Sequence, residues 1–325
     1  MHPAMTLFAR LAASTVAAAV LALPAAGQTP TRISITTGGT GGVYYPLGGG
    51  MANVLSKYLP GLTATAEVTG GSVDNLKLIN AGKSEVAFSM ADATWDAYQG
   101  VDKFKDSKVS ARTLMVLYPN KTHVVTVEGS GINKLSDLKG KRVSTGSPGS
   151  GTEILAFRIL EAAGIDPKKD LKQERLGAAE SVNAIKDRKI DAFFWSGGVP
   201  TAAVTDLAAT PGLKMKLIDH DEYVDAMNKR FGPLYVKAVI PAGSYPAQDK
   251  PNTEIDVWNI LIASDKMSDQ MAYDIVKTLY DKKAELVAVH AEAKNIDLKN
   301  QAQGSPIPFH PGAKKYLAEQ GIKVN

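Results

Sequence analysis

The sequence predicts an α/β protein of two lobes, each built on a mainly parallel β-sheet flanked by helices. Its length is the first reason, because a chain of 325 residues exceeds the roughly 100–150 residues that one domain core usually organises. The second is that short β-branched runs alternate with amphipathic stretches along the chain, joined by polar, glycine-rich loops. Strands that alternate with helices in this way usually form parallel sheets, since each helix crosses from one strand to the next.

The first 27 residues are expected to be a secretory signal peptide. Arg10 precedes the apolar run 11–23, and small residues at 25–27 precede Gln28. The run is too short for a membrane span, which needs roughly 20 apolar residues. We therefore expect cleavage after Gly27, export to the periplasm and a mature protein without a membrane anchor.

The first lobe is expected to begin with three strands, at 32–36, 63–68 and 86–90. Glycine-rich loops at 38–42 and 69–72 follow the first two strands, and each loop leads into an amphipathic helix. Two further extended runs, 113–117 and 123–127, flank a polar break that contains Pro119. We interpret this break as a crossing of the chain to the second lobe.

A second series of strands and helices follows the crossing. A strand at 141–145 leads into the loop 146–151, and Ser150 and Glu153 have the spacing of a capping box at a helix start. The apolar strand 190–195 precedes the loop 196–198, and the run 234–240 looks like the return crossing. The predicted division is lobe 1 at 28–120 with 240–325, and lobe 2 at 121–239.

The four glycine-rich loops are candidate ligand contacts. In an open α/β sheet the ligand crevice lies beyond the carboxyl ends of the strands, where these loops are expected. Each loop leads into a helix whose first N–H groups are free and whose dipole favours anions, so carboxylate, phosphate or sulfate can bind there without arginine. Glycines at such turns often serve only the turn geometry. The convergence of four loops is what favours a binding site.

Motifs for catalysis and cofactors are absent from the sequence. The chain has no cysteine, which excludes thiol nucleophiles and Cys-type zinc sites. Gly146 and Gly151 have P-loop spacing, but Thr152 stands where the phosphate-binding lysine belongs. No Gly-x-Ser-x-Gly motif or His-x-x-x-His pair occurs, and lysines are interleaved with acids rather than clustered. We expect a binding protein with no catalytic residues, no metal, no cofactor and no nucleic-acid partner.

A few side chains beside the loops have candidate roles in binding. Tyr44 opens the first helix and Trp195 ends an apolar strand, so either ring is suited to cover an apolar ligand stem. Asp92 stands just beyond a strand end, close to Ser89. Two interpretations of Asp92 stay open, pairing with a ligand ammonium or capping a helix. In the rival hypothesis of an exported enzyme, Asp92 is the general base.

Several motifs carry a resemblance to a known family. Residues 37–48 read Thr-Gly-Gly-Thr-Gly-Gly-Val-Tyr-Tyr-Pro-Leu-Gly, and residues 69–76 read Thr-Gly-Gly-Ser-Val-Asp-Asn-Leu. The likeness continues in order through 131–143, 146–152, 191–200 and 240–245. These segments resemble TAXI-type solute-binding proteins of TRAP (tripartite ATP-independent periplasmic) transporters.

The resemblance implies a type II-like periplasmic-binding-protein fold that closes by a hinge around a small solute. The protein would deliver this solute to an ion-gradient-driven membrane permease of the TRAP type, and we expect it to be a monomer. Family members bind glutamate, glutamine or related C5 acids such as 2-oxoglutarate, so a small carboxylate is implied, either a dicarboxylate or an acidic amino acid. An ABC-type binding protein for another small anion is the alternative, since it shares the fold.

The resemblance also implies which residues line the cleft between the lobes. The hydroxyl groups of Ser147, Ser150 and Thr152 are expected to hold the ligand carboxylate together with backbone N–H groups. The full predicted set is Gly42, Val43, Tyr44, Ser89, Asp92, Ser147, Gly149, Ser150, Gly151, Thr152, Trp195 and Gly198.

Overall fold

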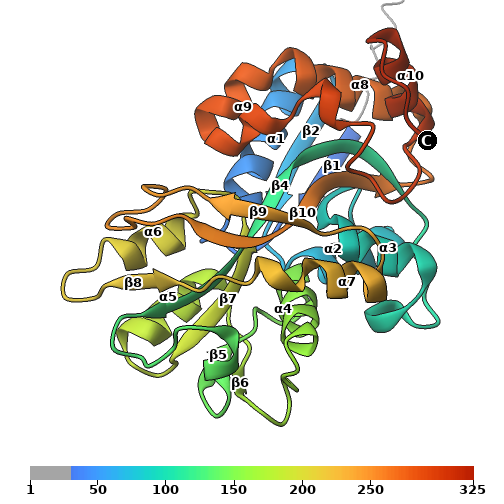
Figure 1. Cartoon of the computed structure of the whole chain (residues 1–325). Coiled ribbons are helices and arrows are strands. Elements are labelled where there is room, and N and C mark those ends of the chain that lie inside the picture. Colours follow the sequence, from blue (N-terminus) through green and yellow to red (C-terminus); the bar gives the residue numbers. More distant parts are fainter. Residues whose placement is uncertain (1–30) are drawn as a thin grey trace, which may run out of the picture.

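The computed structural model describes residues 31–325, so the predicted signal peptide lies outside the described residues. Ten strands form one sheet with the order β2-β1-β3-β10-β4-β7-β5-β6, in which β8 pairs with β4 and β9 with β10. Helices pack around both ends of this long sheet, which gives the two parts visible in Figure 1. Within the described residues, no helix is both long and apolar enough to cross a membrane.

The elements have the following bounds. The strands are β1 (Thr31–Thr36), β2 (Leu62–Glu67), β3 (Val86–Met90), β4 (Ala111–Val127), β5 (Arg142–Ser144), β6 (Lys172–Glu174), β7 (Ala192–Gly197), β8 (Met215–Leu217), β9 (Val236–Ile240) and β10 (Asn252–Ser264). The α-helices are α1 (Tyr44–Tyr58), α2 (Ser72–Asn80), α3 (Ala91–Gln99), α4 (Gly151–Ala162), α5 (Ala178–Lys186), α6 (Ala202–Ala208), α7 (Val224–Phe231), α8 (Asp269–Asp281), α9 (Lys283–Val289) and α10 (Pro311–Glu319). A short 3₁₀ helix, η1 (Asp102–Phe104), follows α3.

Lobe 1 is the part built on β1, β2 and β3. β1 pairs in parallel with both β2 and β3, as expected for strands joined by crossover helices. Helix α1 packs on the sheet through Leu47, Met51 and Leu55, which are fully buried and recur at the helical period. The three strands and two helices predicted for this part of the chain are confirmed.

Lobe 2 is the part built on β5, β6 and β7. β5 pairs in parallel with β6 and β7, so each end of the single sheet consists of parallel strands. A separate small core lies between β7 and the helices α5 and α6, and it includes the buried residues Val182, Phe193 and Leu207. The predicted α/β fold class is confirmed, but the sheet as a whole is mixed, because every pair made by β4 and β10 is antiparallel.

Two long antiparallel strands, β4 and β10, run through both lobes. Their pairing extends from Asp256 opposite Lys121 to Ser264 opposite Ala111. The break predicted between 117 and 123 is wrong, because β4 continues through Pro119. Proline lacks an N–H group and is tolerated at a bulge, and the register of the two strands is irregular between Trp258 and Ile260, next to Pro119.

The predicted return crossing at 234–240 forms β9, which pairs antiparallel with the first half of β10. The strand that continues into lobe 1 is β10 itself, whose second half pairs with β3. We therefore propose that the lobe boundaries lie inside the two long strands, near 118–121 of β4 and 256–259 of β10. The backbone links between the lobes are then two adjacent strand segments, which is the arrangement that a hinge requires.

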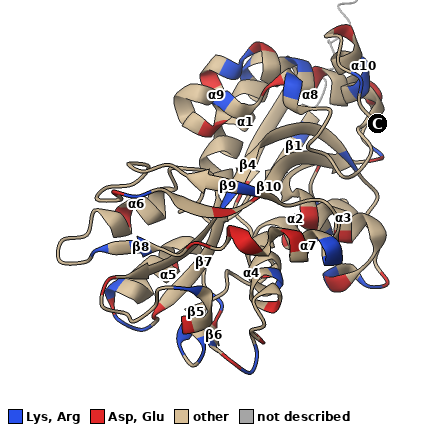
Figure 2. Ribbon diagram, viewed as in Figure 1, with Lys and Arg blue, Asp and Glu red and all other residues tan. Residues whose placement is uncertain are grey.

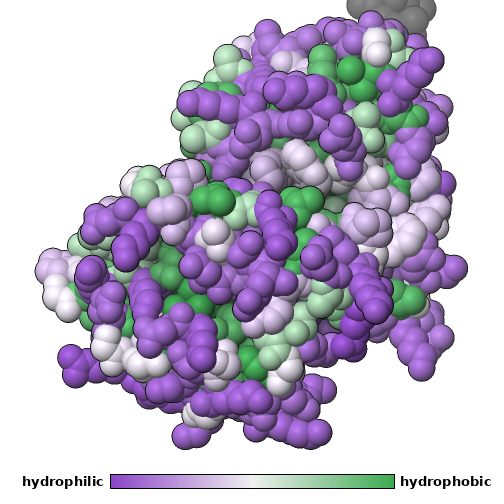
Figure 3. Space-filling model, in the orientation of Figure 1, coloured by the Kyte–Doolittle hydropathy of each residue, from purple (hydrophilic) through white to green (hydrophobic). Residues whose placement is uncertain are grey.

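The surface is polar and mixed in charge. Figure 2 shows basic and acidic residues interspersed over the elements of both lobes. The face seen in Figure 3 is covered mostly by hydrophilic residues, with small hydrophobic areas between them. Among the described residues, most large exposed apolar side chains occur singly, for example Val68 and Val101. Two others, Val236 and Val239, both lie on β9.

Candidate functional site

A cavity of about 380 Å³ lies where loops of both lobes meet. Its volume is in the range of known small-molecule sites. The lining comes from the ends of strands and the starts of helices, as predicted, at 38–44, 68–72, 146–148, 150–152, 175–180 and 195–197, together with Met90 and Tyr118.

Three helix N-termini open onto this cavity. Helix α1 contributes Val43 and Tyr44, α4 contributes Gly151 and Thr152, and α5 contributes its first residues from Ala178. The first N–H groups of a helix have no partner within the helix, and the helix dipole adds partial positive charge there. The three starts together favour a small anion, and Glu180 of α5 is the acidic residue of the lining.

The first N–H groups of α2 are bonded to lobe 2. The backbone N–H groups of Val73 and Asp74 donate to the carbonyl oxygen of Gly149, at 3.0 and 3.1 Å. The Ser147 hydroxyl donates to the Gly70 carbonyl oxygen at 3.0 Å. These bonds join lobe 1 to lobe 2, so the structure shows the lobes closed on one another. Gly149, predicted to touch the ligand, does not line the cavity.

The hydroxyl groups predicted to hold a carboxylate already have partners in the protein. Ser150 Oγ accepts from the Glu153 N–H at 3.1 Å and donates to the Ser147 carbonyl oxygen at 2.7 Å, so it caps α4. Thr152 Oγ1 faces the N–H of Ser196 at 3.4 Å. All three hydroxyl-bearing residues line the cavity. Their backbone N–H groups are better hydrogen-bond donors to an anion than their hydroxyl groups.

An arginine that the sequence analysis missed also lines the cavity. Arg175 makes a two-pronged ion pair with Glu153, with Nε 2.5 Å from Oε1 and Nη2 3.0 Å from Oε2. Glu153 therefore pairs with Arg175 instead of completing the predicted capping box. Arg175 lies in the irregular segment after β6, and no motif in the sequence marks it. Its side chain is 48% exposed, so the guanidinium remains accessible to a ligand.

Trp195 closes one wall of the cavity against lobe 1. Its Nε1 donates to Thr201 Oγ1 at 2.9 Å, which fixes the ring. A Cβ atom placed on Gly42 would lie 2.8 Å from Cη2 of this ring, so only glycine allows the observed contact. Trp195 and Gly42 therefore meet across the lobes, and both line the cavity as predicted.

Two tyrosines line the cavity. The Tyr44 hydroxyl donates to Oδ1 of Asn259, and its ring packs on Phe88 with centroids 4.9 Å apart. Tyr118 is fully buried, and its hydroxyl has no hydrogen-bond partner among the described residues. Burial raises the pKa of both phenols, so both remain neutral donors. The sequence analysis missed Tyr118, because it assigned this residue to the break between strands.

Besides Gly149, three further predicted site residues do not line the cavity. Ser89 is buried and accepts from Thr94 Oγ1 at 2.8 Å. Gly198 packs against the side chain of Glu292. Asp92 is fully buried on α3, where its carboxylate accepts from the Ala93 N–H at 2.8 Å and from the Tyr235 hydroxyl at 3.0 Å.

These partners correct the two functional interpretations of Asp92. A carboxylate enclosed by its own helix, Tyr235 and the nearby Arg158 cannot reach a ligand ammonium in the cavity. The same enclosure leaves it unable to act as a general base there.

Comparison with known proteins identifies the family. The model of the NMT1-like family matches residues 35–321, which includes both lobes and every loop of the cavity. The chain belongs to the NMT1-like family. Solved structures similar to this NMT1-like chain include a protein from Bordetella bronchiseptica RB50, with 18% identity, a TM-score of 0.53 and 89% coverage of each chain.

Two further solved structures are more distant in shape. One is the periplasmic aliphatic sulphonate binding protein SsuA from Escherichia coli, with 13% identity, a TM-score of 0.47 and 90% coverage of each chain. The other is a ligand-binding component of an ABC-type import system from Staphylococcus aureus, with 12% identity, a TM-score of 0.47, and coverage of 89% of this chain and 84% of that chain. The fold of this NMT1-like protein is that of the two-lobed periplasmic binding proteins.

Proposed function

We propose that this NMT1-like protein is a periplasmic receptor that binds a small organic anion between its lobes and delivers it to a membrane importer. One observation carries the proposal. Three helix N-termini and Arg175 meet at a cavity of about 380 Å³ whose walls come from both lobes. Such a cavity stabilises negative charge, and it forms fully only when the lobes close.

The strength of binding expected from this geometry is sufficient for a receptor. Hydrogen bonds to a charged group contribute about 1.5–3 kcal/mol each. A few of them, from the first N–H groups of α1, α4 and α5, would supply the roughly 8 kcal/mol of a micromolar Kd. The resemblance to TAXI proteins makes glutamate, glutamine and 2-oxoglutarate the first candidates, and sulfonates present a similar anionic head.

A thermal-shift screen of organic acids, amino acids and sulfonates tests the proposal. A ligand that binds only the folded protein raises its Tm. Arg175→Gln should reduce the shift given by the best acid, whereas Lys172→Gln removes the same charge from an exposed site on β6, outside the cavity. If no anion raises the Tm, or if both variants lose the shift equally, the cavity is not the anion site.

The class of importer is a separate part of the proposal. An ABC-type import component is among the structures of similar fold, whereas the TRAP assignment rests on the sequence motifs alone. We therefore place an ABC-type importer first and a TRAP permease second. Uptake in reconstituted vesicles separates them, since ABC-type import requires ATP and TRAP import requires an ion gradient. Transport that proceeds with an ion gradient and no ATP would reverse this order.

A further inference from the structure

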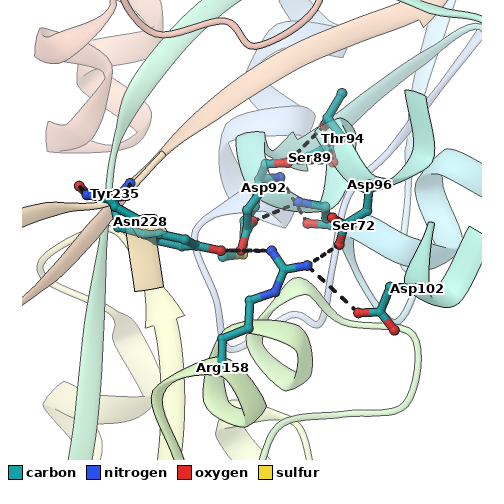
Figure 4. A network of polar contacts seen from close by, with 11 residues as sticks. Ser72, Ser89, Asp92, Thr94, Asp96, Asp102, Arg158, Asn228 and Tyr235 are labelled. Atoms are coloured by element: carbon teal, nitrogen blue, oxygen red, sulfur yellow. Dashed lines mark hydrogen bonds and ion pairs between the residues drawn. The ribbon is translucent and has the colours of Figure 1, made fainter. Parts of the chain in front are cut away.

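A buried ionic network joins the lobes at a distance from the ligand cavity, and Arg158 of α4 is its centre (Figure 4). Arg158 Nη2 lies 2.5 Å from Oδ2 of Asp96 and 3.8 Å from Oδ2 of Asp102. Its Nη1 donates to the Tyr235 hydroxyl at 2.8 Å and lies 3.7 Å from Oδ2 of Asp92.

The members of this network come from different lobes. Arg158 and Tyr235 belong to lobe 2, whereas Asp92 and Asp96 lie on α3 and Asp102 on η1, all in lobe 1. The Arg158 side chain is only 6% exposed, and its guanidinium lies over the Phe231 ring at 4.4 Å. Its ion pairs with Asp92 and Asp96 are therefore buried contacts between the lobes, whereas Asp102 is 50% exposed at a second cavity that Asp96 and Arg158 also line.

The network and the ligand cavity share one helix. The first residues of α4, Gly151 and Thr152, line the cavity, and Arg158 follows about two turns later, roughly 10 Å along the axis. None of Arg158, Asp92, Asp96 and Asp102 lines the cavity. A rotation of lobe 2 that opens the cavity must move α4, and so it must also move Arg158 away from α3.

We infer that Arg158 is a positioning residue for ligand binding, which holds the lobes closed around the ligand without touching it. The inference rests on the proposed function for its link to a ligand. In the closed protein the guanidinium lies between the buried carboxyl groups of Asp92 and Asp96, so its removal leaves two buried acids without their cation. In the open protein water solvates the same acids. Loss of Arg158 should therefore shift the equilibrium toward the open state.

Closure can be measured without any ligand. The natural chain has no cysteine, so a Gly41→Cys/Ala203→Cys pair provides the only thiols. A Cβ atom on Gly41 of lobe 1 would lie 3.3 Å from Cβ of Ala203 on α6 of lobe 2, slightly closer than the usual range of disulfides, and 3.0 Å from Cβ of Ala179, so the cysteine requires a small local shift that is common to every variant compared. The rate of disulfide formation under a fixed mild oxidant then reports how often the lobes close.

Arg158→Gln in this background should slow disulfide formation by about 5- to 150-fold, the usual range of coupling between sites. Arg230→Gln is the matched control. Arg230 also contacts the Phe231 ring, but it pairs at 2.9 Å with Glu161 of α4, within lobe 2. The control variant should close at the rate of the parent.

A second variant separates positioning from folding. Arg158→Lys keeps the charge but cannot contact the acids and Tyr235 with one planar group, so an intermediate closing rate is expected. If Arg158→Gln unfolds, as judged by circular dichroism, Arg158→Lys alone tests the inference against Arg230→Gln. Closing rates equal to the parent in folded Arg158 variants would overturn it. Because no ligand is used, this outcome is independent of whether the thermal-shift screen finds an anion.

Discussion

Gly42→Ala tests whether the lobes close on one another at the cavity. The added methyl group would lie 2.8 Å from Cη2 and 3.0 Å from Cζ2 of Trp195, whereas ordinary contacts begin near 3.4 Å. The indole has little room to retreat, because its Nε1 donates to Thr201 and Gly197 packs against the ring. The substitution therefore opposes closure while leaving each lobe intact.

The size of the effect follows from the cost of overpacking. A methyl group forced into a well-packed contact costs about 1–3 kcal/mol, which corresponds to a loss of affinity of about 5- to 150-fold. Calorimetry with the acid that gives the largest thermal shift measures this loss. The Tm of the ligand-free protein should change little, since Gly42 precedes α1 and the added methyl group meets Trp195 only when the lobes are closed.

Gly39→Ala is the control for this prediction. It lies in the same loop, and a Cβ atom there would meet nothing within 4 Å. If Gly42→Ala and Gly39→Ala bind the acid equally well, Trp195 does not close on Gly42 in the liganded protein, and the closed cavity is not the bound state.

Three further predictions concern single side chains. Ser150→Ala should lower the free energy of unfolding by about 1 kcal/mol through loss of the α4 cap; denaturant titration that shows unchanged stability but weaker ligand binding would favour the hydroxyl as a ligand contact. Tyr118→Phe should leave ligand-free stability unchanged, because the buried hydroxyl has no partner, and should weaken the best ligand about fivefold in calorimetry; a drop in stability with unchanged affinity would contradict this. Burial raises the pKa values of Glu254 and Asp256, which share Lys121 as their cation. The folded protein therefore binds more protons than the unfolded chain. Its free energy of unfolding falls as pH rises above the ordinary pKa values of these acids, by up to about 1.4 kcal/mol per pH unit. In thermal melts between about pH 5 and 9, Glu254→Gln should reduce the fall of stability with pH. If the fall is unchanged, other titratable groups cause the pH dependence.

The sequence was sufficient for the elements that carry clear local patterns. Alternation and helical spacing located β1, α1 and α4, and glycine-rich loops located the N-termini of α1 and α4 at the cavity, whereas α5 and its loop 175–180 were not predicted. Among the strands, β6, β8 and β10 were not predicted, and β4 was predicted with a break. Pro119 indicates a break by its own chemistry, but pairing with β10 at an irregular register accommodates it.

Side-chain partners could not be predicted, because they depend on residues far apart in the sequence. Asp92 appears beside a strand end in the sequence, but the fold buries it against Tyr235 and near Arg158. Arg175 and Tyr118 belong to no motif and reach the cavity only through the packing of the two lobes. The glycine-rich loops that line the cavity could therefore be predicted, whereas the loop 175–180 and the partners of individual hydroxyl and carboxylate groups could not.

The central claim is that the cavity between the lobes binds a small anion through helix N-termini. The most direct test is calorimetric titration of the wild-type protein with the best acid from the screen and with its uncharged amide of the same shape. We predict a Kd near micromolar for the acid and a loss of at least about tenfold for the amide, because the amide carries no charge for the helix N-termini and Arg175 to stabilise. Equal affinity for the acid and the amide would contradict the account.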